Sequence, residues 1–538
     1  MPSLPSRLAV FLATFAVLAW AAAARADWPQ WGGTAERNMI SAETNLPETF
    51  EPGHKLPSGG GIDPETTQNV RWAAKLGSQT YGNPTVAGGR VFVGTDDFML
   101  SEHDSRFKRT KGGVVQCLDD VGGELLWQLV VPQRSGGLPK GALFGHQHLG
   151  TCSSPTVDGD RVYVVSSACE VLCLDADGLA DGNDGPFTDE GRYMVGGGGK
   201  PVELAPNDAD VIWRYDMIEQ CGVVPHDAAS CSVLIHGDFL YTSTSNGVDN
   251  PHAKVVHPEA PAIIVLEKKS GRLVAVEGEQ LSTRLWHAQW SSPSLGRVGG
   301  RTLVFFGGGD GFCYAFEALE KLPEGDLPVK LKTVWKYDCN PPHYRLRDGK
   351  PIPYYDGDKR KRRGNNNDGK YVGPSQIIAT PVFHKGRIYV AIGQDPAHGR
   401  GRGMLHCIDA TKTGDVTESG KVWSYEGLDR TIASVAVADG LVYCPDIAGR
   451  FHCLDAESGE VYWTHETGAE TWASPLVADG KVYLGTQKHF WVFAVGKEAK
   501  VLSQIRLGAP AYCSAIADRG TLYVTSQRYL WAVTATGQ

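Results

Sequence analysis

The sequence predicts an all-β fold: an eight-bladed β-propeller of four-stranded antiparallel blades. Three observations carry this prediction. A ten-residue frame occurs eight times, and its last three copies start 40 residues apart. The last unit also lacks a fourth strand, which a segment before the first unit can supply. Repeats of this length are typical of solenoids and propellers, because each unit must bury its apolar face against its neighbours.

The frame is clearest at residues 474–483, which read Ser-Pro-Leu-Val-Ala-Asp-Gly-Lys-Val-Tyr. Asp479-Gly480 between two apolar runs predicts a two-residue hairpin turn, since such turns need positive φ at both central positions. The eight copies begin at Asn83, Ser154, Ser232, Ser292, Thr380, Ser434, Ser474 and Ser514. Their strand-closing aromatics are Phe92, Tyr163, Tyr241, Phe305, Tyr389, Tyr443, Tyr483 and Tyr523.

Most frames are followed by two further strands. The third strand ends in an apolar residue and an acid, as in Leu454-Asp455, and the fourth carries a Trp in most units, as in Trp463. An acid repeated at the same place before a turn predicts a side chain that caps the turn, not a catalytic carboxylate. Four short antiparallel strands in 40 residues predict one propeller blade.

The two ends of the repeat predict how the ring closes. The last unit ends after its third strand, so the eighth blade lacks a fourth strand of its own. Residues 70–76, which include Trp72, look like a fourth strand that precedes the first blade. Pairing the two segments completes the eighth blade and removes the exposed strand edges.

The motifs also resemble those of a known family. Ser-Pro-x-Val-x-Asp-Gly-x-Val-Tyr, together with Cys-Leu-Asp-Ala-x-x-Gly-x-x-x-Trp at residues 453–463, is similar to the PQQ-like repeat with its tryptophan-docking motif. That repeat occurs in quinoprotein alcohol dehydrogenases and in the propeller lipoprotein of the outer-membrane assembly machinery. The resemblance covers residues 69–538. It implies the fold and leaves the activity open, since one fold hosts many functions.

The chain divides into three parts. Residues 1–26 have the pattern of a signal peptide, with Arg7, an apolar core and Ala24-Arg25-Ala26 before the expected cleavage point. An uncleaved membrane anchor is the alternative. Residues 27–68 are expected to form an extended arm with Trp28 and Trp31 packed on the ring, and residues 69–538 form the propeller. This predicts an exported protein, periplasmic or extracellular, with no transmembrane segment after cleavage.

Net charge limits the classes of partner, and the positions of the cysteines limit the disulfides to be expected. Loss of Arg7 and Arg25 takes the net charge from −9 to −11, which makes nucleic acid an unfavourable partner. Most of the twelve cysteines fall in columns of small apolar residues, where Cys acts as a packing residue. One disulfide is a candidate: if Ala448-Gly449 forms a two-residue turn, Cys444 and Cys453 face each other across the hairpin.

Inserted loops predict where the function lies. In an up-and-down blade, the loops between strands two and three share one face with the loops between blades, and we call this the first face. Most large insertions fall there, over blades one to five: residues 95–112, 132–153, 216–231, 246–261, 276–291, 339–379 and 394–403. Long loops on a rigid scaffold commonly carry function.

Polar side chains of this face converge on the mouth of the central channel. The expected ligand-binding set is His146, His148, His226, Asp227, His287, Gln289, Arg430 and Glu470. Imidazoles from several blades suit a metal ion or a polar ligand. The alternative is that exposed loops simply collect His, Asp and Asn.

An acidic loop on the opposite face is the candidate metal site. Asp177, Asp181, Asn183 and Asp184 offer the hard oxygen ligands that Ca²⁺ prefers, although the EF-hand spacing is absent. A polar, turn-rich loop without an ion is the alternative.

These features favour a binding or scaffold protein of the cell envelope that acts through the first face of blades one to five. Its partner would be a protein, or a small-molecule or glycan ligand. The alternative is a dehydrogenase dependent on PQQ (pyrroloquinoline quinone) and calcium, which the family resemblance implies. No catalytic residues can be assigned to it, and the adjacent Cys-Cys pair found near the cofactor in many such enzymes is absent.

Overall fold

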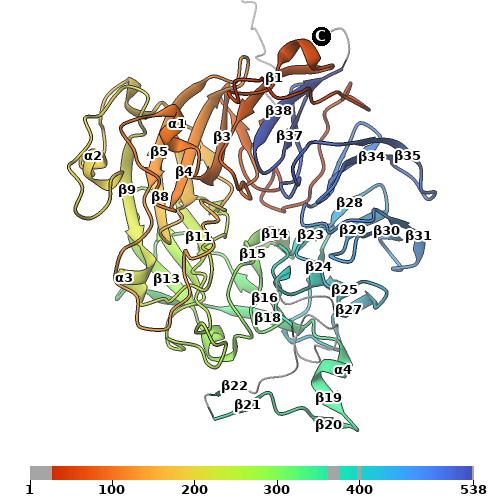
Figure 1. Cartoon of the computed structure of the whole chain (residues 1–538). Coiled ribbons are helices and arrows are strands. Elements are labelled where there is room, and N and C mark those ends of the chain that lie inside the picture. Colours follow the sequence, from red (N-terminus) through yellow and green to blue (C-terminus); the bar gives the residue numbers. More distant parts are fainter. Residues whose placement is uncertain (1–26, 358, 361–374, 397–400, 536–538) are drawn as a thin grey trace, which may run out of the picture.

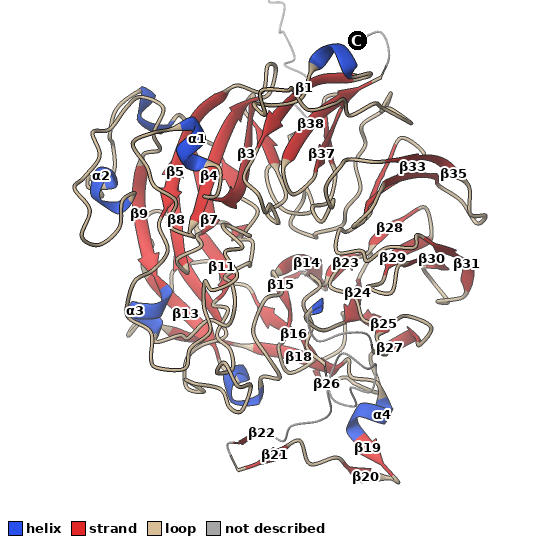
Figure 2. Cartoon of the chain, in the orientation of Figure 1, coloured by secondary structure: helices blue, strands red, loops and turns tan. Residues whose placement is uncertain are grey.

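The computed structural model describes residues 27–357, 359–360, 375–396 and 401–535, so the predicted signal peptide at residues 1–26 lies outside the described part. Eight antiparallel sheets stand around a common centre, and the colours of Figure 1 follow the chain once around the ring. Strands dominate, and the helices are short pieces within connections (Figure 2). The predicted eight-bladed propeller is confirmed.

Each blade contains four antiparallel strands in chain order, except that the outer strand of the last blade is β1. Blade one contains β2 (Thr85–Ala87), β3 (Arg90–Asp96), β4 (Gly113–Asp119) and β5 (Leu125–Val131). Blade two contains β6 (Thr156–Asp158), β7 (Arg161–Val165), β8 (Glu170–Asp175) and β9 (Val211–Asp216). Blade three contains β10 (Leu234–His236), β11 (Phe239–Ser243), β12 (Ile263–Glu267) and β13 (Leu273–Glu277). Blade four contains β14 (Ser294–Val298), β15 (Arg301–Gly307), β16 (Phe312–Glu317) and β18 (Thr333–Asp338).

The second half of the ring repeats this order. Blade five contains β23 (Val382–His384), β24 (Arg387–Ile392), β25 (Met404–Asp409) and β27 (Lys421–Tyr425). Blade six contains β28 (Ala436–Ala438), β29 (Leu441–Pro445), β30 (Arg450–Asp455) and β31 (Val461–Glu466). Blade seven contains β32 (Leu476–Ala478), β33 (Lys481–Gly485), β34 (Phe490–Ala494) and β35 (Val501–Ile505). Blade eight contains β36 (Ile516–Asp518), β37 (Thr521–Thr525), β38 (Tyr529–Thr534) and β1 (Val70–Lys75).

The connections hold the remaining elements. Two short strands add in parallel to the outer strands of blades three and four: β17 (Val329–Leu331) and β26 (Gly414–Asp415). Two small hairpins are β19 (Leu346–Arg347) with β20 (Lys350–Pro351), and β21 (Tyr355–Asp356) with β22 (Lys359–Arg360). The α-helices are α1 (Leu100–His103), α2 (Glu190–Tyr193), α3 (Met217–Cys221) and α4 (Pro342–Arg345), and the 3₁₀ turns are η1 (Pro64–Thr66), η2 (Gly178–Ala180) and η3 (Leu281–Arg284). Within the described residues, none of these helices has the length and apolar character needed to span a bilayer.

The ring closes as predicted. Strand β1 pairs antiparallel with β38, so that Trp72 lies opposite Ala532, and Figure 1 shows the red β1 beside the blue β38. The repeated hairpin also has the expected turn: Leu476 pairs with Tyr483, and φ is +51° at Asp479 and +67° at Gly480.

Fourth-strand tryptophans dock most blades onto the next one. The Trp127 indole N–H donates to the Ala176 carbonyl at 2.9 Å, and the Trp423 indole N–H donates to the Ala456 carbonyl at 3.0 Å. Gly459 lies directly against the Trp423 ring, where a Cβ atom would come within 2.6 Å of it. The docking motif therefore requires both the Trp and a glycine in the following blade.

Third-strand acids cap turns, as the repeat predicts. One carboxylate oxygen of Asp119 accepts the backbone N–H groups of Val121 and Gly122, at 3.0 and 2.7 Å. Asp455 accepts those of Glu457 and Ser458, both at 2.9 Å.

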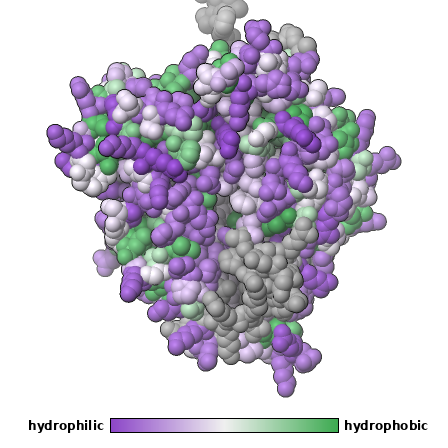
Figure 3. Space-filling view, in the orientation of Figure 1, coloured by the Kyte–Doolittle hydropathy of each residue, from purple (hydrophilic) through white to green (hydrophobic). Residues whose placement is uncertain are grey.

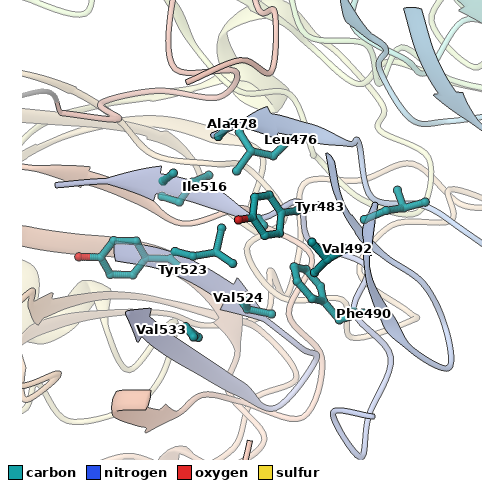
Figure 4. Close-up of a cluster of buried hydrophobic side chains, with 14 of the residues drawn as sticks. Leu476, Ala478, Tyr483, Phe490, Val492, Ile516, Tyr523, Val524 and Val533 are labelled. Atoms are coloured by element: carbon teal, nitrogen blue, oxygen red, sulfur yellow. The ribbon is translucent and has the colours of Figure 1, made fainter. Parts of the chain in front are cut away.

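Apolar side chains fill the wedges between blades. Figure 4 shows one such wedge, where Leu476, Tyr483 and Val492 of blade seven lie near Ile516 and Tyr523 of blade eight. All five side chains are almost completely buried. Burial of this kind stabilises by roughly 25 cal/mol for each Å² of apolar surface removed from water. The face in Figure 3, by contrast, is mostly hydrophilic, with scattered apolar residues.

The first residue of each frame belongs to a hydrogen-bonded belt around the central channel. Backbone N–H groups donate to the hydroxyl of the next blade, for example from Ser434 to Ser474 at 2.9 Å and from Ser474 to Ser514 at 2.8 Å. The belt passes through the ring closure, because the Ser514 N–H donates to the Asn83 side chain. This role explains why the frame begins with Ser, Thr or Asn.

An N-terminal arm crosses one end of the channel. Residues 28–41 exchange backbone hydrogen bonds with the first strands of several blades, including Val86, Leu295 and Val477. The Trp31 indole N–H donates to the Thr380 hydroxyl at 3.0 Å. Arg37 is fully buried and donates to the carbonyls of Trp31, Val233 and Pro293. The arm therefore closes the channel at this end.

The candidate disulfide does not form. All twelve cysteines are free, and Cys453 pairs with Tyr443, while Cys444 pairs with His452. Asp446 is the reason, because its backbone N–H bonds to the Arg450 carbonyl and its carboxylate accepts the Arg450 N–H, which makes the loop one residue longer than expected. A one-residue shift turns a side chain to the other face of a sheet.

Candidate ligand site at the mouth of the central channel

The channel holds a blind pocket of about 290 Å³, close to the size range of small-molecule sites. Most of its lining comes from two columns of the repeat. One is the belt residue that opens each frame. The other is the residue two positions earlier: Tyr81, Cys152, Ser230, Trp290, Ile378, Ile432, Trp472 and Tyr512. Trp31 of the arm also lines the pocket, so the closed end carries an aromatic ring.

Aromatic rings form one wall of the pocket. Tyr81, Trp472 and Tyr512 come from blades one, seven and eight, and all three are partly exposed. The Trp472 and Tyr512 rings stack at 4.1 Å between centroids, and Tyr81 lies at 5.7 and 6.1 Å from them with similar planes. Partly exposed rings of this kind can pack against an apolar face of a ligand.

Polar groups lie across from this wall, on blades two to five. Gln147 donates to one carboxylate oxygen of Asp227 at 3.1 Å, and both residues line the pocket together with Asp395. Burial raises the pKa of Cys152 to about 12, so this lining thiol stays protonated at neutral pH and is no nucleophile.

Three histidines converge beside the pocket. His226 and His287 are fully buried and His252 is half-buried. Their ring centroids are 4.3 to 4.8 Å apart, and Nε2 of His252 lies 2.8 Å from Nε2 of His287. His287 also packs edge-on against Trp290, whose ring lines the pocket, at 5.0 Å between centroids.

The other residues predicted for the channel mouth are spread more widely. His146 is exposed, and His148 lines a small neighbouring cavity, where burial and then Lys111 lower its pKa. Gln289 is buried and accepts the Gly309 N–H at 2.8 Å. Two further predicted residues lie on blade-to-blade loops: Arg430 is buried, and Glu470 accepts the Trp472 indole N–H at 2.9 Å.

Two features of the site were missing from the sequence-based set. His252 comes from an inserted loop whose sequence does not repeat in other blades, so the repeat gave no signal for it. The aromatic wall did have a signal. The column two positions before the frame contains Tyr, Trp, Trp and Tyr among eight otherwise dissimilar residues.

The acidic loop brings together a different set from the predicted one. Carboxylate oxygens of Asp175, Asp184 and Asp210 lie within 4.8 Å of one another, and Asp177 and Asp181 group with Asp175 in the same way. Asp177 forms an ion pair with Arg90, and Asn183 donates to the buried Glu190 at 3.0 Å. The calcium site stays a prediction.

Buried carboxylates are the unusual part of this loop. Asp210 is fully buried, and its Oδ1 has no hydrogen-bond partner among the described residues. Burial raises the pKa of Asp210, with smaller contributions from Glu190 and Asp175 in the same direction. A divalent cation would relieve this repulsion.

Fold and pocket together define a PQQ-like propeller with a blind central site. The family model described as outer membrane protein assembly factor BamB matches residues 103–294 and 401–502, more than half of the chain. The chain therefore belongs to this PQQ-like propeller family. A search of curated proteins finds no match.

Solved structures give the same fold. BamB from Moraxella catarrhalis aligns with a TM-score of 0.50 and 12% identity, over 87% of this chain and 98% of that one. A europium-containing methanol dehydrogenase aligns with a TM-score of 0.57 and 12% identity, over 95% of this chain and 98% of that one. Identities this low support the fold alone.

The described part of the pocket lining is a poor match for PQQ, the cofactor that the family resemblance implies. PQQ carries three carboxylates, which need cationic or N–H-rich surroundings when they are buried. The described pocket lining contributes two carboxylates of its own, Asp227 and Asp395, and no Lys or Arg. Among the described residues, the lining therefore lacks the positive charge that would balance three carboxylates.

Proposed function

We propose that this protein is a binding propeller of the cell envelope that holds a neutral, hydroxyl-rich ring ligand of the glycan class in its mouth pocket. The observation that carries the proposal is the composition of the pocket lining. The wall of Tyr81, Trp472 and Tyr512 suits the apolar face of a sugar ring. Asp227 and Asp395 suit its hydroxyl groups, because carboxylates accept strong hydrogen bonds.

The belt adds donors at the closed end of the pocket. Each belt hydroxyl that accepts a backbone N–H, such as that of Ser474, retains its own O–H to donate to a ligand oxygen. A ligand without charge is favoured because the described lining holds carboxylates and no cation.

The envelope location rests on two supports. One is the predicted signal peptide at residues 1–26, and the other is the family's description as an outer-membrane assembly factor. The inserted loops of blades one to five would then frame the pocket and offer the surface on which a protein partner can bind.

The test is calorimetric titration of the purified chain with a panel of defined neutral oligosaccharides, including peptidoglycan-derived and glucan fragments. We expect one ligand class to bind in the pocket, and Trp472→Ala to weaken its binding about two- to tenfold, since an aromatic contact contributes ~0.5–1.5 kcal/mol. Tyr462→Ala is the matched control, because Tyr462 lies on the outer strand of blade six and does not line the pocket.

Two results would overturn the proposal: no oligosaccharide binds, or Trp472→Ala binds as tightly as the unmodified chain. A parallel titration with PQQ and Ca²⁺ tests the alternative. Saturable PQQ binding together with dye-linked alcohol oxidation would establish the dehydrogenase instead.

A further inference from the structure

A second kind of chemistry lies beside the pocket, in the histidine cluster of His226, His252 and His287. The three side chains come from three different loops of blades three and four. One ligand nitrogen from each histidine lies within 4.8 Å of the other two. Three imidazoles from separate loops therefore share one small volume.

Backbone carbonyls orient two of the three rings. Nδ1 of His226 lies 2.7 Å from the Val248 carbonyl, and Nδ1 of His252 lies 2.9 Å from the Asn250 carbonyl. A carbonyl only accepts, so each Nδ1 carries the hydrogen and the lone pair is on Nε2. Metal-binding histidines are held in this way, with the second nitrogen donating to a carbonyl or carboxylate.

The backbone around the cluster is tightly constrained. The Val248 N–H donates to the His287 carbonyl at 2.8 Å, which ties the loop that carries His252 to the loop that carries His287. Gly247 lies where a Cβ would come within 2.6 Å of the His226 Cβ. His252 itself has φ of +57°, a left-handed conformation that a non-glycine residue adopts at a cost.

We propose that His226, His252 and His287 form a binding site for a transition-metal ion of the Zn²⁺ and Cu²⁺ class. An all-imidazole set suits these ions and not Ca²⁺ or Mg²⁺, which take oxygen ligands. Zn–N bonds of about 2.0–2.1 Å in tetrahedral geometry place the nitrogens about 3.4 Å apart. The Nε2 atoms of His252 and His287, now 2.8 Å apart, need to separate by roughly 0.5 Å, a small rotation of two side chains.

A three-histidine set also leaves a coordination position for a further ligand, as in zinc enzymes with three protein ligands. The cluster lies close enough to the pocket for a pocket ligand to take that position, since His287 packs on Trp290, which lines the pocket. The metal site does not depend on the glycan proposal: either could hold without the other.

The test uses the full chain, stripped with a chelator and titrated with Zn²⁺ by calorimetry and with Co²⁺ by visible absorption. We expect one equivalent of Zn²⁺ to bind, and Co²⁺ to give the intense visible bands of a tetrahedral nitrogen site. His252→Gln should weaken Zn²⁺ at least about 100-fold, because it removes one of three ligands. His252 is the best position to change because it is half-buried, so its loss disturbs packing least.

His146→Gln is the matched control, because His146 is exposed on a neighbouring loop outside the cluster. Equal Zn²⁺ affinity in the unmodified chain and in His252→Gln would overturn the proposal, as would a loss of affinity in His146→Gln. X-ray absorption of the Zn²⁺-loaded unmodified chain needs no variant. Scattering from three imidazoles would support the site, and an oxygen-only shell would refute it.

Discussion

Removal of the Arg37 side chain tests whether the N-terminal arm holds the ring together. Arg37 is completely buried, and its guanidinium donates to three carbonyls: Pro293 at 3.1 Å, Val233 at 2.8 Å and Trp31 at 2.5 Å. These bonds link the arm to blades three and four. No acidic side chain of the described residues forms an ion pair with it. Arg37→Met keeps an unbranched side chain, although a shorter one, and removes every side-chain donor.

Two opposing contributions set the expected loss in the free energy of unfolding. Hydrogen bonds to a charged group contribute about 1.5–3 kcal/mol each, so three of them contribute roughly 4–9 kcal/mol. Burial lowers the pKa of Arg37 to about 10, which corresponds to a desolvation cost of roughly 3 kcal/mol that the substitution relieves. We therefore expect Arg37→Met to lower the free energy of unfolding by about 3 kcal/mol. Backbone strain cancels in the comparison, because Met and Arg are equally disfavoured at the φ of +61° found here.

Urea denaturation of the full chain measures this loss, and limited proteolysis of residues 27–68 shows whether the arm detaches first. Lys55→Met is the control, because Lys55 is an exposed cation of the same arm. Stability within about 0.5 kcal/mol of the unmodified chain, with no faster cleavage of the arm, would refute the reasoning.

Three further predictions concern single positions. Gly459→Ala should cost ~2–3 kcal/mol in urea denaturation, since the Cβ would press on Trp423, whereas Gly480→Ala at a similar φ, with open space around it, should cost only ~1 kcal/mol. Burial lowers the pKa of His406 to about 4, so its unfolding takes up a proton below pH 6.5. This residue should therefore contribute a loss of stability of up to ~3 kcal/mol between pH 6.5 and 4, and His406→Gln should make the pH dependence of the melts shallower by that contribution. Calcium should raise the melting temperature, and Asp210→Asn should abolish that rise while stabilising the calcium-free chain; a calcium effect that survives the substitution places the ion elsewhere.

The sequence was most informative where the same pattern occurs in several blades, because variation in a single copy then matters little. Eight copies of one frame fixed the blade, the Asp-Gly turn and the pairing of β1 with β38, because each copy independently satisfies the same packing and hydrogen-bond requirements. It was least informative about turn lengths and strand register at the level of one residue. The Cys444–Cys453 expectation failed because the Asp446 side chain lengthens one turn by one residue.

The histidine cluster illustrates a second limit. His226 and His287 lie in the loops that lead into their frames, six and five residues before them, and were predicted together. His252 lies in an insertion whose sequence does not repeat in other blades. Its proximity depends on backbone bonds between loops, such as Val248 to His287, and those depend on the local course of the chain. Propensity and periodicity carry no information about such contacts.

The two columns of the repeat that line the pocket have different roles: one keeps the ring closed, and the other sets the shape of the pocket. The belt column cannot vary much, since a residue such as Ser474 must accept a backbone N–H from the neighbouring blade to keep the ring closed. The column two residues earlier does not have to accept such a hydrogen bond. Side chains as different as Ile432 and Trp472 occupy it. Substitutions there change the shape and polarity of the pocket while the belt stays intact. Ligand preference should therefore follow this second column, and exchanging Trp472 should alter binding far more than it alters stability.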